Sequence, residues 1–123
     1  MTKIIFTISV LQTLPFGLCA ITAPVWLFSQ FGVSLDSSGE LIAQGYGATL
    51  IGFGLVLWGL RSARLLETRL WLLAGLALFN AIEAIIQFKG GIAGTAQPII
   101  FGNVGLHAAM AVACIVGLLR VRT

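Results

Sequence analysis

The sequence predicts an all-α, polytopic membrane protein with four transmembrane helices and both termini in the cytoplasm. Three observations lead to this fold class. Of the 123 residues, 59% are hydrophobic and only 9% are charged, whereas an ordinary soluble domain is about 25% charged. The apolar residues fall into four runs, and each run approaches the ~20 residues that a helix needs to cross a bilayer. Finally, the cationic residues are distributed very unevenly among the segments between these runs.

The expected spans cover residues of about 4–31, 41–60, 70–88 and 98–119. Little of the chain lies outside them, so we expect a single four-helix transmembrane domain over residues 1–123. The short loops leave no room for a soluble catalytic domain, a nucleotide-binding fold or a nucleic-acid-binding module. The net charge of +3 is therefore interpreted as a signal of membrane topology.

The positions of the basic residues indicate the orientation of the helices. Only Lys89 lies in the first or third loop, whereas the other basic residues lie at the two termini and in the middle loop. Because Lys and Arg are retained on the cytoplasmic side of a membrane, both termini and the middle loop are expected inside the cell. The residues on the cytoplasmic side are Lys3, Arg61, Arg64, Arg69, Arg120 and Arg122.

The first span contains two prolines, and the second is preceded by a helix-start signal. Pro15 and Pro24 each remove a backbone donor and favour a kink. The nearby hydroxyls of Thr13 and Thr22 are expected to satisfy the carbonyls that the prolines free. In the first loop, Ser37 followed by a glutamate three residues later forms the pattern of a capping box, which satisfies amide groups at the start of a helix.

Glycines of the second span form two rows on opposite faces. Gly45, Gly52 and Gly59 repeat every seven residues, and Gly47 and Gly54 repeat about 180° away. Small residues allow helix backbones to approach closely in lipid. Since neighbours in a compact bundle lie roughly 90° apart around a helix, two opposed rows predict that one of them contacts another protein. The alternative is that glycine is simply frequent in membrane helices.

Polar residues of the third and fourth spans predict an intramembrane site. On the third span, Asn80, Glu83 and Gln87 fall within an arc of about 60°. A carboxylate at the bilayer centre costs roughly 2.5–3.5 kcal/mol and therefore normally faces a partner or a cavity. Counting the rise of an antiparallel hairpin from its loop places Glu83 level with Asn103, and Asn80 level with His107. We expect a polar pocket in the outer half of the membrane.

Four interpretations of this polar site remain open. The residues form interhelical hydrogen bonds that set the helix register, or His107 ligates a haem or a chlorophyll-type pigment. Alternatively, Glu83 and His107 form a proton-linked site in a small transporter, or the pair acts in intramembrane catalysis or quinone binding. No nucleophile with a supporting set of residues is present in the sequence, and no Cys or His spacing indicates a metal site. We therefore identify no catalytic residue and favour a non-enzymatic role, although the catalytic interpretation stays open.

The first half of the chain also carries an arrangement of aromatic, glycine and acidic residues. It comprises Pro24 and Trp26, then Phe31, Gly32, Val33, Leu35 and Asp36, and later Tyr46, Gly47, Ala48, Gly54 and Trp58. In this arrangement the chain resembles a family of uncharacterised bacterial membrane proteins of similar length with four predicted helices. The resemblance implies a multi-pass protein of the bacterial inner membrane, but it implies no activity, substrate or cofactor.

These observations lead to a functional expectation. We expect a small inner-membrane protein that acts by helix association, as a homo-oligomer or as an accessory subunit of a membrane complex. Its partners are the lipid bilayer and either a second copy or another membrane protein, and no nucleic acid. The alternative is a small proton-coupled transporter that uses Glu83 and His107.

Overall fold

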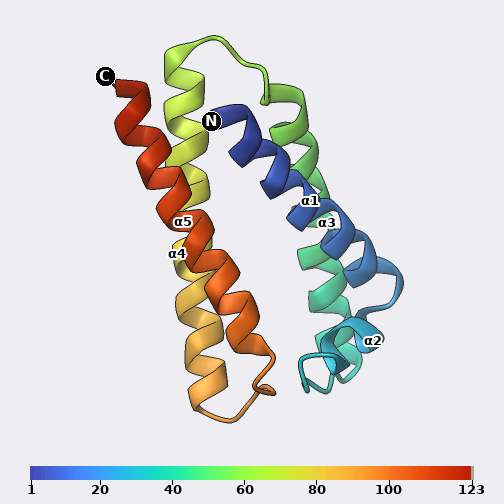
Figure 1. The fold of residues 1–123 in the computed structure, drawn as a ribbon. Helices are drawn as coiled ribbons and strands as arrows, with labels where there is room; N and C mark the ends of the chain where they lie inside the picture. The colour runs from blue at the N-terminus through green and yellow to red at the C-terminus, as the bar shows by residue number, and fades with distance from the viewer. Residues whose placement is uncertain (123) are drawn as a thin grey trace. The chain divides into compact units, whose positions relative to one another are not determined.

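The computed structural model describes residues 1–122, and every regular element in that range is a helix (Figure 1). Four helices are long and apolar enough to cross a membrane, which confirms the all-α class and the number of candidate spans. A fifth helix is short. The helices are α1 (Thr2–Thr22), α2 (Pro24–Ser29), α3 (Ser37–Leu60), α4 (Leu66–Ile92) and α5 (Ile100–Arg122).

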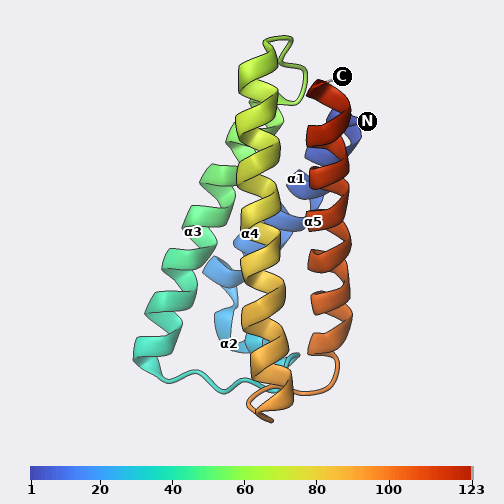
Figure 2. The same cartoon turned by 90° about the vertical axis from the view of Figure 1, so that its left-hand side faces the viewer.

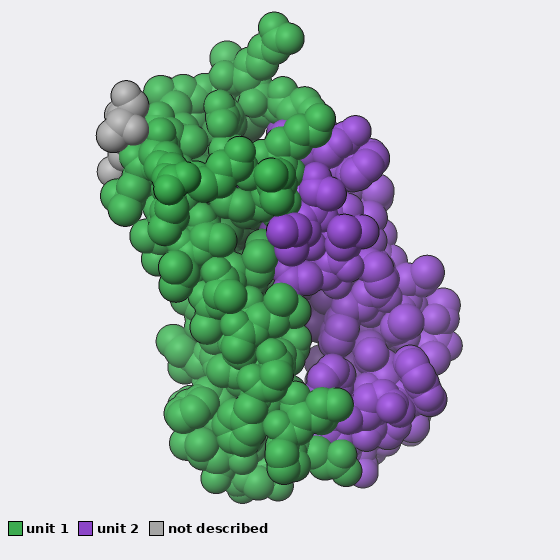
Figure 3. Space-filling model, viewed as in Figure 1, with its two compact units in different colours: residues 1–5, 62–123 green, residues 6–61 purple. Residues whose placement is uncertain are grey.

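The chain divides into two compact units, which Figure 3 shows in different colours. Unit 1 contains Met1–Ile5 and the chain from Ser62 onward, with α4 and α5 as an antiparallel pair. The two helices run side by side in Figures 1 and 2. Unit 2 is Phe6–Arg61 and contains most of α1, together with α2 and α3. That the four long helices form a single domain stays a prediction.

The first span is shorter than the sequence predicts. Helix α1 continues through Pro15 but ends at Thr22, so the predicted span of residues 4–31 is wrong at its carboxyl end. At Ala23 the backbone leaves the helical region, with φ −147° and ψ 55°, and Pro24 begins α2. A residue that precedes proline is disfavoured in the helical region, and proline is tolerated at the first position of the new helix.

The threonine hydroxyls near the prolines do not satisfy the carbonyls that the prolines free. The Thr13 hydroxyl donates to the carbonyl of Ser9 at 2.9 Å, and the Thr22 hydroxyl donates to that of Leu18 at 2.9 Å. Each acceptor lies four residues before its own threonine, whereas a proline frees the carbonyl four residues before itself. The expected compensation is therefore wrong at both sites.

Helix α3 begins with a cap that differs from the predicted one by a single residue. Asp36 is the N-cap, with φ −85° and ψ 179°, and its carboxylate accepts a hydrogen bond from the Gly39 amide at 2.7 Å. Ser37 is already the first helical residue, so the capping box predicted from Ser37 is wrong. A carboxylate is favoured at this position because it also interacts with the positive end of the helix dipole.

Helices α3, α4 and α5 begin or end several residues from the limits of the predicted apolar runs. The predicted span of residues 70–88 lies inside α4, which continues to Ile92. Its end is a Schellman motif: Gly94 has φ +69°, the Thr95 amide donates to the Gly90 carbonyl at 3.1 Å, and the Gly94 amide donates to Gly91. Helix boundaries follow such capping chemistry, whereas hydropathy reports only where apolar side chains stop.

Basic residues gather at one end of unit 1. The Arg69 guanidinium donates to the Thr2 hydroxyl at 2.8 Å, and the Arg120 guanidinium lies 3.5 Å from the sulfur of Met1. These contacts bring the amino terminus, the start of α4 and the end of α5 together. Lys89 lies near the far end of α4. Within this unit, the two termini and the segment that enters α4 therefore share one end.

Candidate functional site

The candidate site is a cluster of five polar side chains between α4 and α5. Asn80, Glu83 and Gln87 come from α4, and Asn103 and His107 come from α5. Because the two helices are antiparallel neighbours, their polar faces meet. The structure connects all five residues into two hydrogen-bonded groups. The outer group is Glu83, Gln87 and Asn103, and the inner group is Asn80 and His107.

The outer group is a chain of donors that leads to Glu83. The Asn103 amide nitrogen donates to Gln87 Oε1 at 2.8 Å, and Gln87 Nε2 donates to Glu83 Oε2 at 2.9 Å. Gln87 lies one helical turn from Glu83 on the same face, and its amide bonds to the carboxyl group through Nε2 and to Asn103 through Oε1. The depth count places Glu83 level with Asn103, but the residue that bonds to Asn103 is Gln87, one turn farther along α4. Glu83 is connected to α5 through the Gln87 amide.

The inner group fixes the protonation pattern of His107. Asn80 Nδ2 donates to the Leu76 carbonyl at 2.8 Å, and Asn80 Oδ1 lies 2.8 Å from His107 Nδ1. A carbonyl only accepts hydrogen bonds, so the Asn80 amide must turn its nitrogen to Leu76 and its oxygen to the imidazole. His107 Nδ1 therefore carries a proton, and in the neutral ring Nε2 holds the lone pair. The pairing expected from equal depth is confirmed for these two residues.

Burial changes along the inward faces of α4 and α5. Toward the basic end, the side chains are completely or almost completely buried, as for Leu73, Leu76 and Cys114. Asn80 is also buried, with 2% of its surface exposed. Toward the Lys89 end, the remaining polar residues are only partly buried, although they lie on the same faces: Glu83, Gln87, Asn103 and His107. Along these faces the side chains thus change from buried toward the basic end to partly buried toward the Lys89 end.

Within unit 2, one of the two glycine rows of α3 packs against α1. A Cβ atom added to Gly47 would lie 2.7 Å from the Gly17 carbonyl oxygen, and one added to Gly17 would lie 2.8 Å from the Gly47 carbonyl oxygen. A Cβ atom on Gly54 would collide with Leu14. The two helices thus meet backbone against backbone, a contact that only glycine permits.

The opposite row is open. A Cβ atom added to Gly45, Gly52 or Gly59 would meet no atom within 4 Å. Gly17, the partner of Gly47, is a packing residue that the sequence analysis missed. Its signal is a run of small residues at helical spacing on α1, since Thr13 precedes it by four positions and Ala20 follows it by three.

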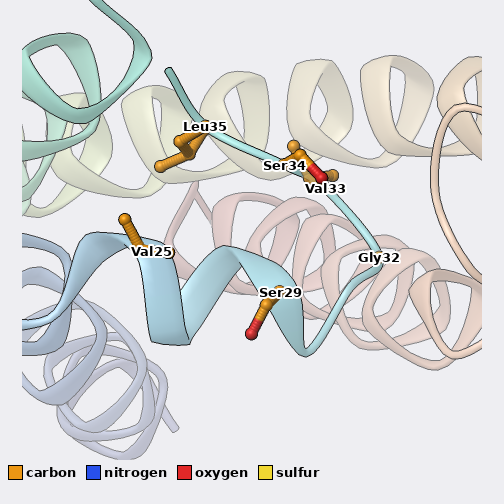
Figure 4. A pocket seen from close by; sticks show the side chains of 6 residues that line it. All are labelled: Val25, Ser29, Gly32, Val33, Ser34 and Leu35. Carbon is orange, nitrogen blue, oxygen red and sulfur yellow. The ribbon is translucent and has the colours of Figure 1, made fainter. Parts of the chain in front are cut away.

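A pocket of about 230 Å³ lies in unit 2, where the segment after α2 folds back along that helix (Figure 4). Val25 on α2 and Leu35 on the returning segment line opposite walls. The Ser29 hydroxyl is already used, because it donates to the Trp26 carbonyl at 2.8 Å. The remaining lining residues are Gly32, Val33 and Ser34. None of the polar residues predicted from the sequence lines this pocket, and its lining offers no reactive group.

Neither a metal-binding group within the described residues nor a similar protein indicates a ligand for this site. Among residues 1–122, no group of three or more His, Cys, Asp or Glu side chains is placed to hold a metal ion. Comparison with known proteins gave no relative: no family model matches the chain, and no curated protein or solved structure matches it. Function is therefore inferred from the polar cluster and the glycine rows, and the resemblance of the first half to a bacterial family stays a prediction.

Proposed function

We propose that this chain is a small multi-pass protein of the bacterial inner membrane that acts by helix association, as a homo-oligomer or as an accessory subunit of a membrane complex. The observation that carries the proposal is the open glycine row of α3, Gly45, Gly52 and Gly59, on which an added Cβ atom would meet nothing. The bacterial location rests on the resemblance of the first half of the chain.

Glycine destabilises a helix unless its small size allows another helix to pack closely against it. Each glycine inside a helix is about 1 kcal/mol less favourable than alanine, and in lipid that loss is offset when the small residue allows another helix to approach. The Gly17–Gly47 contact is an example within this chain. The open row repeats the same requirement on the opposite face of α3, where α1 does not use it. The row is thus open to a helix from outside unit 2, and the proposal assigns it to a helix of another chain.

The proposed orientation places both termini and the segment between α3 and α4 in the cytoplasm. It is supported by the charge distribution and by the gathering of Arg69 and Arg120 near the amino terminus in unit 1. Single cysteines at Ser62 and at Gln97, in a variant lacking the native cysteines, are expected to react with a membrane-impermeant thiol reagent from opposite sides. Gln97 suits this test better than Gly94, whose positive φ disfavours a side chain. Labelling of both cysteines from the same side would contradict the orientation.

The association is tested by enlarging one glycine of the open row. Gly52→Leu is expected to lower the mass of the particle in mild detergent, or to release the chain from its complex in native membranes, while its helix content is retained. Gly75→Leu is the matched control, because Gly75 on α4 is equally open but lies outside the row. A wild-type chain that is monomeric both in detergent and in native membranes would overturn the proposal, as would equal effects of the two variants.

A second candidate function is proton-coupled transport through Glu83 and His107. The observation that favours it is the partial exposure of Glu83 and His107, next to the buried side chains of Leu73, Leu76 and Cys114 toward the basic end. A site that is reached from one side and closed on the other is typical of a transporter in one of its states. The protein in liposomes is then expected to carry a pH-dependent proton flux that Glu83→Gln abolishes without unfolding. A flux equal to that of empty liposomes would exclude this function.

A further inference from the structure

His107 keeps one ring nitrogen for a partner outside its present contacts. Its Nδ1 is engaged by Asn80, and Nε2 makes no hydrogen bond with any residue in the described range. His107 is partly buried, and no buried side-chain nitrogen or oxygen among residues 1–122 lacks a partner. Nε2 must therefore reach the molecular surface. An accessible lone pair on a membrane-spanning helix is costly to leave without a partner, because hydrocarbon offers no hydrogen-bond donor.

The hydrogen bonds around His107 hold its ring in the way that a metal-binding histidine is held. A histidine that binds a metal generally donates its other ring N–H to a fixed acceptor, which sets the tautomer and the orientation of the ring. Here the acceptor is Asn80, and the Leu76 carbonyl holds the Asn80 amide in the required orientation. Asn80 is 2% exposed, so water does not compete for this bond. Phe79 adds an edge contact to the imidazole, with ring centroids 6.1 Å apart.

The lack of a full set of ligand side chains around His107 among residues 1–122 limits the kind of metal that it could bind. No set of three His, Cys, Asp or Glu side chains is placed to hold a bare ion within the described chain, and a protein site for a bare ion normally supplies three or four ligands. A metal bound to His107 alone must therefore bring its other ligands with it. A flat macrocycle supplies four and leaves an axial position open, and its apolar rim is compatible with hydrocarbon.

We infer that His107 Nε2 is the axial ligand of a metal tetrapyrrole, a haem or a chlorophyll-type pigment, bound at the α4–α5 pair. Binding forms one coordinate bond from the Nε2 lone pair to the metal, with no change in oxidation state. Asn80 acts as a positioning residue that keeps this lone pair on Nε2. This inference goes beyond helix association and does not depend on it, because all residues involved lie in α4 and α5.

Optical titration of the full chain in mild detergent tests the inference. Ferric haem and magnesium protoporphyrin are the two probes, which distinguish an iron from a magnesium pigment. With at least one of them, a saturable 1:1 red shift of the Soret band is expected. His107→Leu should abolish the saturable shift, and His107→Gly should regain it when imidazole is added. Asn80→Leu should weaken the affinity about 10–100-fold.

Gln44→Leu is the matched control, because it removes a polar contact of α3 to the Ile21 carbonyl and leaves the Asn80–His107 pair and the rest of the polar cluster intact. It should bind the probe like the wild type. The inference is overturned if His107→Leu retains the shift, if both probes only partition into micelles as they do without protein, or if Asn80→Leu and Gln44→Leu have equal effects. If His107→Leu fails to fold, the imidazole dependence of His107→Gly decides, since only ligation makes binding depend on added imidazole.

Discussion

The α1–α3 contact and the α4–α5 pair are held together by opposite means. Where α1 crosses α3, Gly17 and Gly47 place backbone against backbone, and the contact depends on the absence of side chains. Between α4 and α5, the contact depends on side chains that reach across, as in the Asn80–His107 and Gln87–Asn103 bonds. Both kinds of contact are compatible with lipid, because neither relies on the hydrophobic effect.

The two contacts are therefore expected to differ in how well they tolerate substitution. A backbone contact cannot adjust to a new side chain without separating the helices, so it fails sharply when a glycine is enlarged. An interhelical hydrogen bond in a membrane contributes only about 0.6 kcal/mol on average, and the α4–α5 pair has more than one. Loss of a single bond there should therefore be small unless it leaves a buried group without a partner.

The largest effect is expected for Gly47→Leu. Its Cβ atom would lie 2.7 Å from the Gly17 carbonyl oxygen, and the leucine would force α1 and α3 apart. We expect a loss of at least about 3 kcal/mol of unfolding free energy, at the upper end of overpacking effects, measured by thermal or denaturant unfolding in detergent micelles. Gly45→Leu on the open row is the control and should leave the folded monomer intact. Equal destabilisation by both variants would contradict the division into packed and open rows.

An intermediate effect is expected for Asn80→Leu. The change removes the acceptor of the His107 Nδ1–H donor and introduces an apolar side chain at a buried position. We expect a loss of about 1–2 kcal/mol, because the donor is left without its partner. The double variant with His107→Leu should be more stable than the sum of the single effects implies, since it removes the donor as well. Strict additivity of the three unfolding free energies would show that the pair does not interact.

Helical periodicity was sufficient to predict which polar residues share a face, but the depth count predicted only one of the two pairs correctly. It placed Glu83 level with Asn103, whereas Asn103 bonds to Gln87. Asn80 and His107 come together because both helices are regular over that length and the depth count needs no further information. The same periodicity identified the two glycine rows of α3. It could not tell which row packs on α1, because that depends on Gly17, a residue of another helix.

The features that sequence reasoning missed are local ones, where two similar residues could each take the same role. Pro15 is accommodated inside α1, whereas Pro24 begins a new helix after Ala23 adopts φ −147°. Both prolines remove one amide donor, so the residue type alone does not distinguish a helix that continues from one that breaks. Likewise Asp36 and Ser37 are adjacent residues that can each cap α3, and the carboxylate of Asp36 is the group that does so.

The smallest effect is expected for Glu83→Gln. Gln87 Nε2 donates to Glu83 Oε2 at 2.9 Å, and a glutamine at position 83 retains an oxygen that accepts this bond. The unfolding free energy should therefore change by no more than about 0.5 kcal/mol, within the range of mild substitutions. Glu83→Leu is the informative comparison, because it removes the acceptor of Gln87 Nε2. Since Gln87 is only partly buried, we expect a loss of about 1 kcal/mol. If Glu83→Gln were as destabilising as Glu83→Leu, the negative charge of Glu83, and not its hydrogen bond to Gln87, would be what the α4–α5 pair requires.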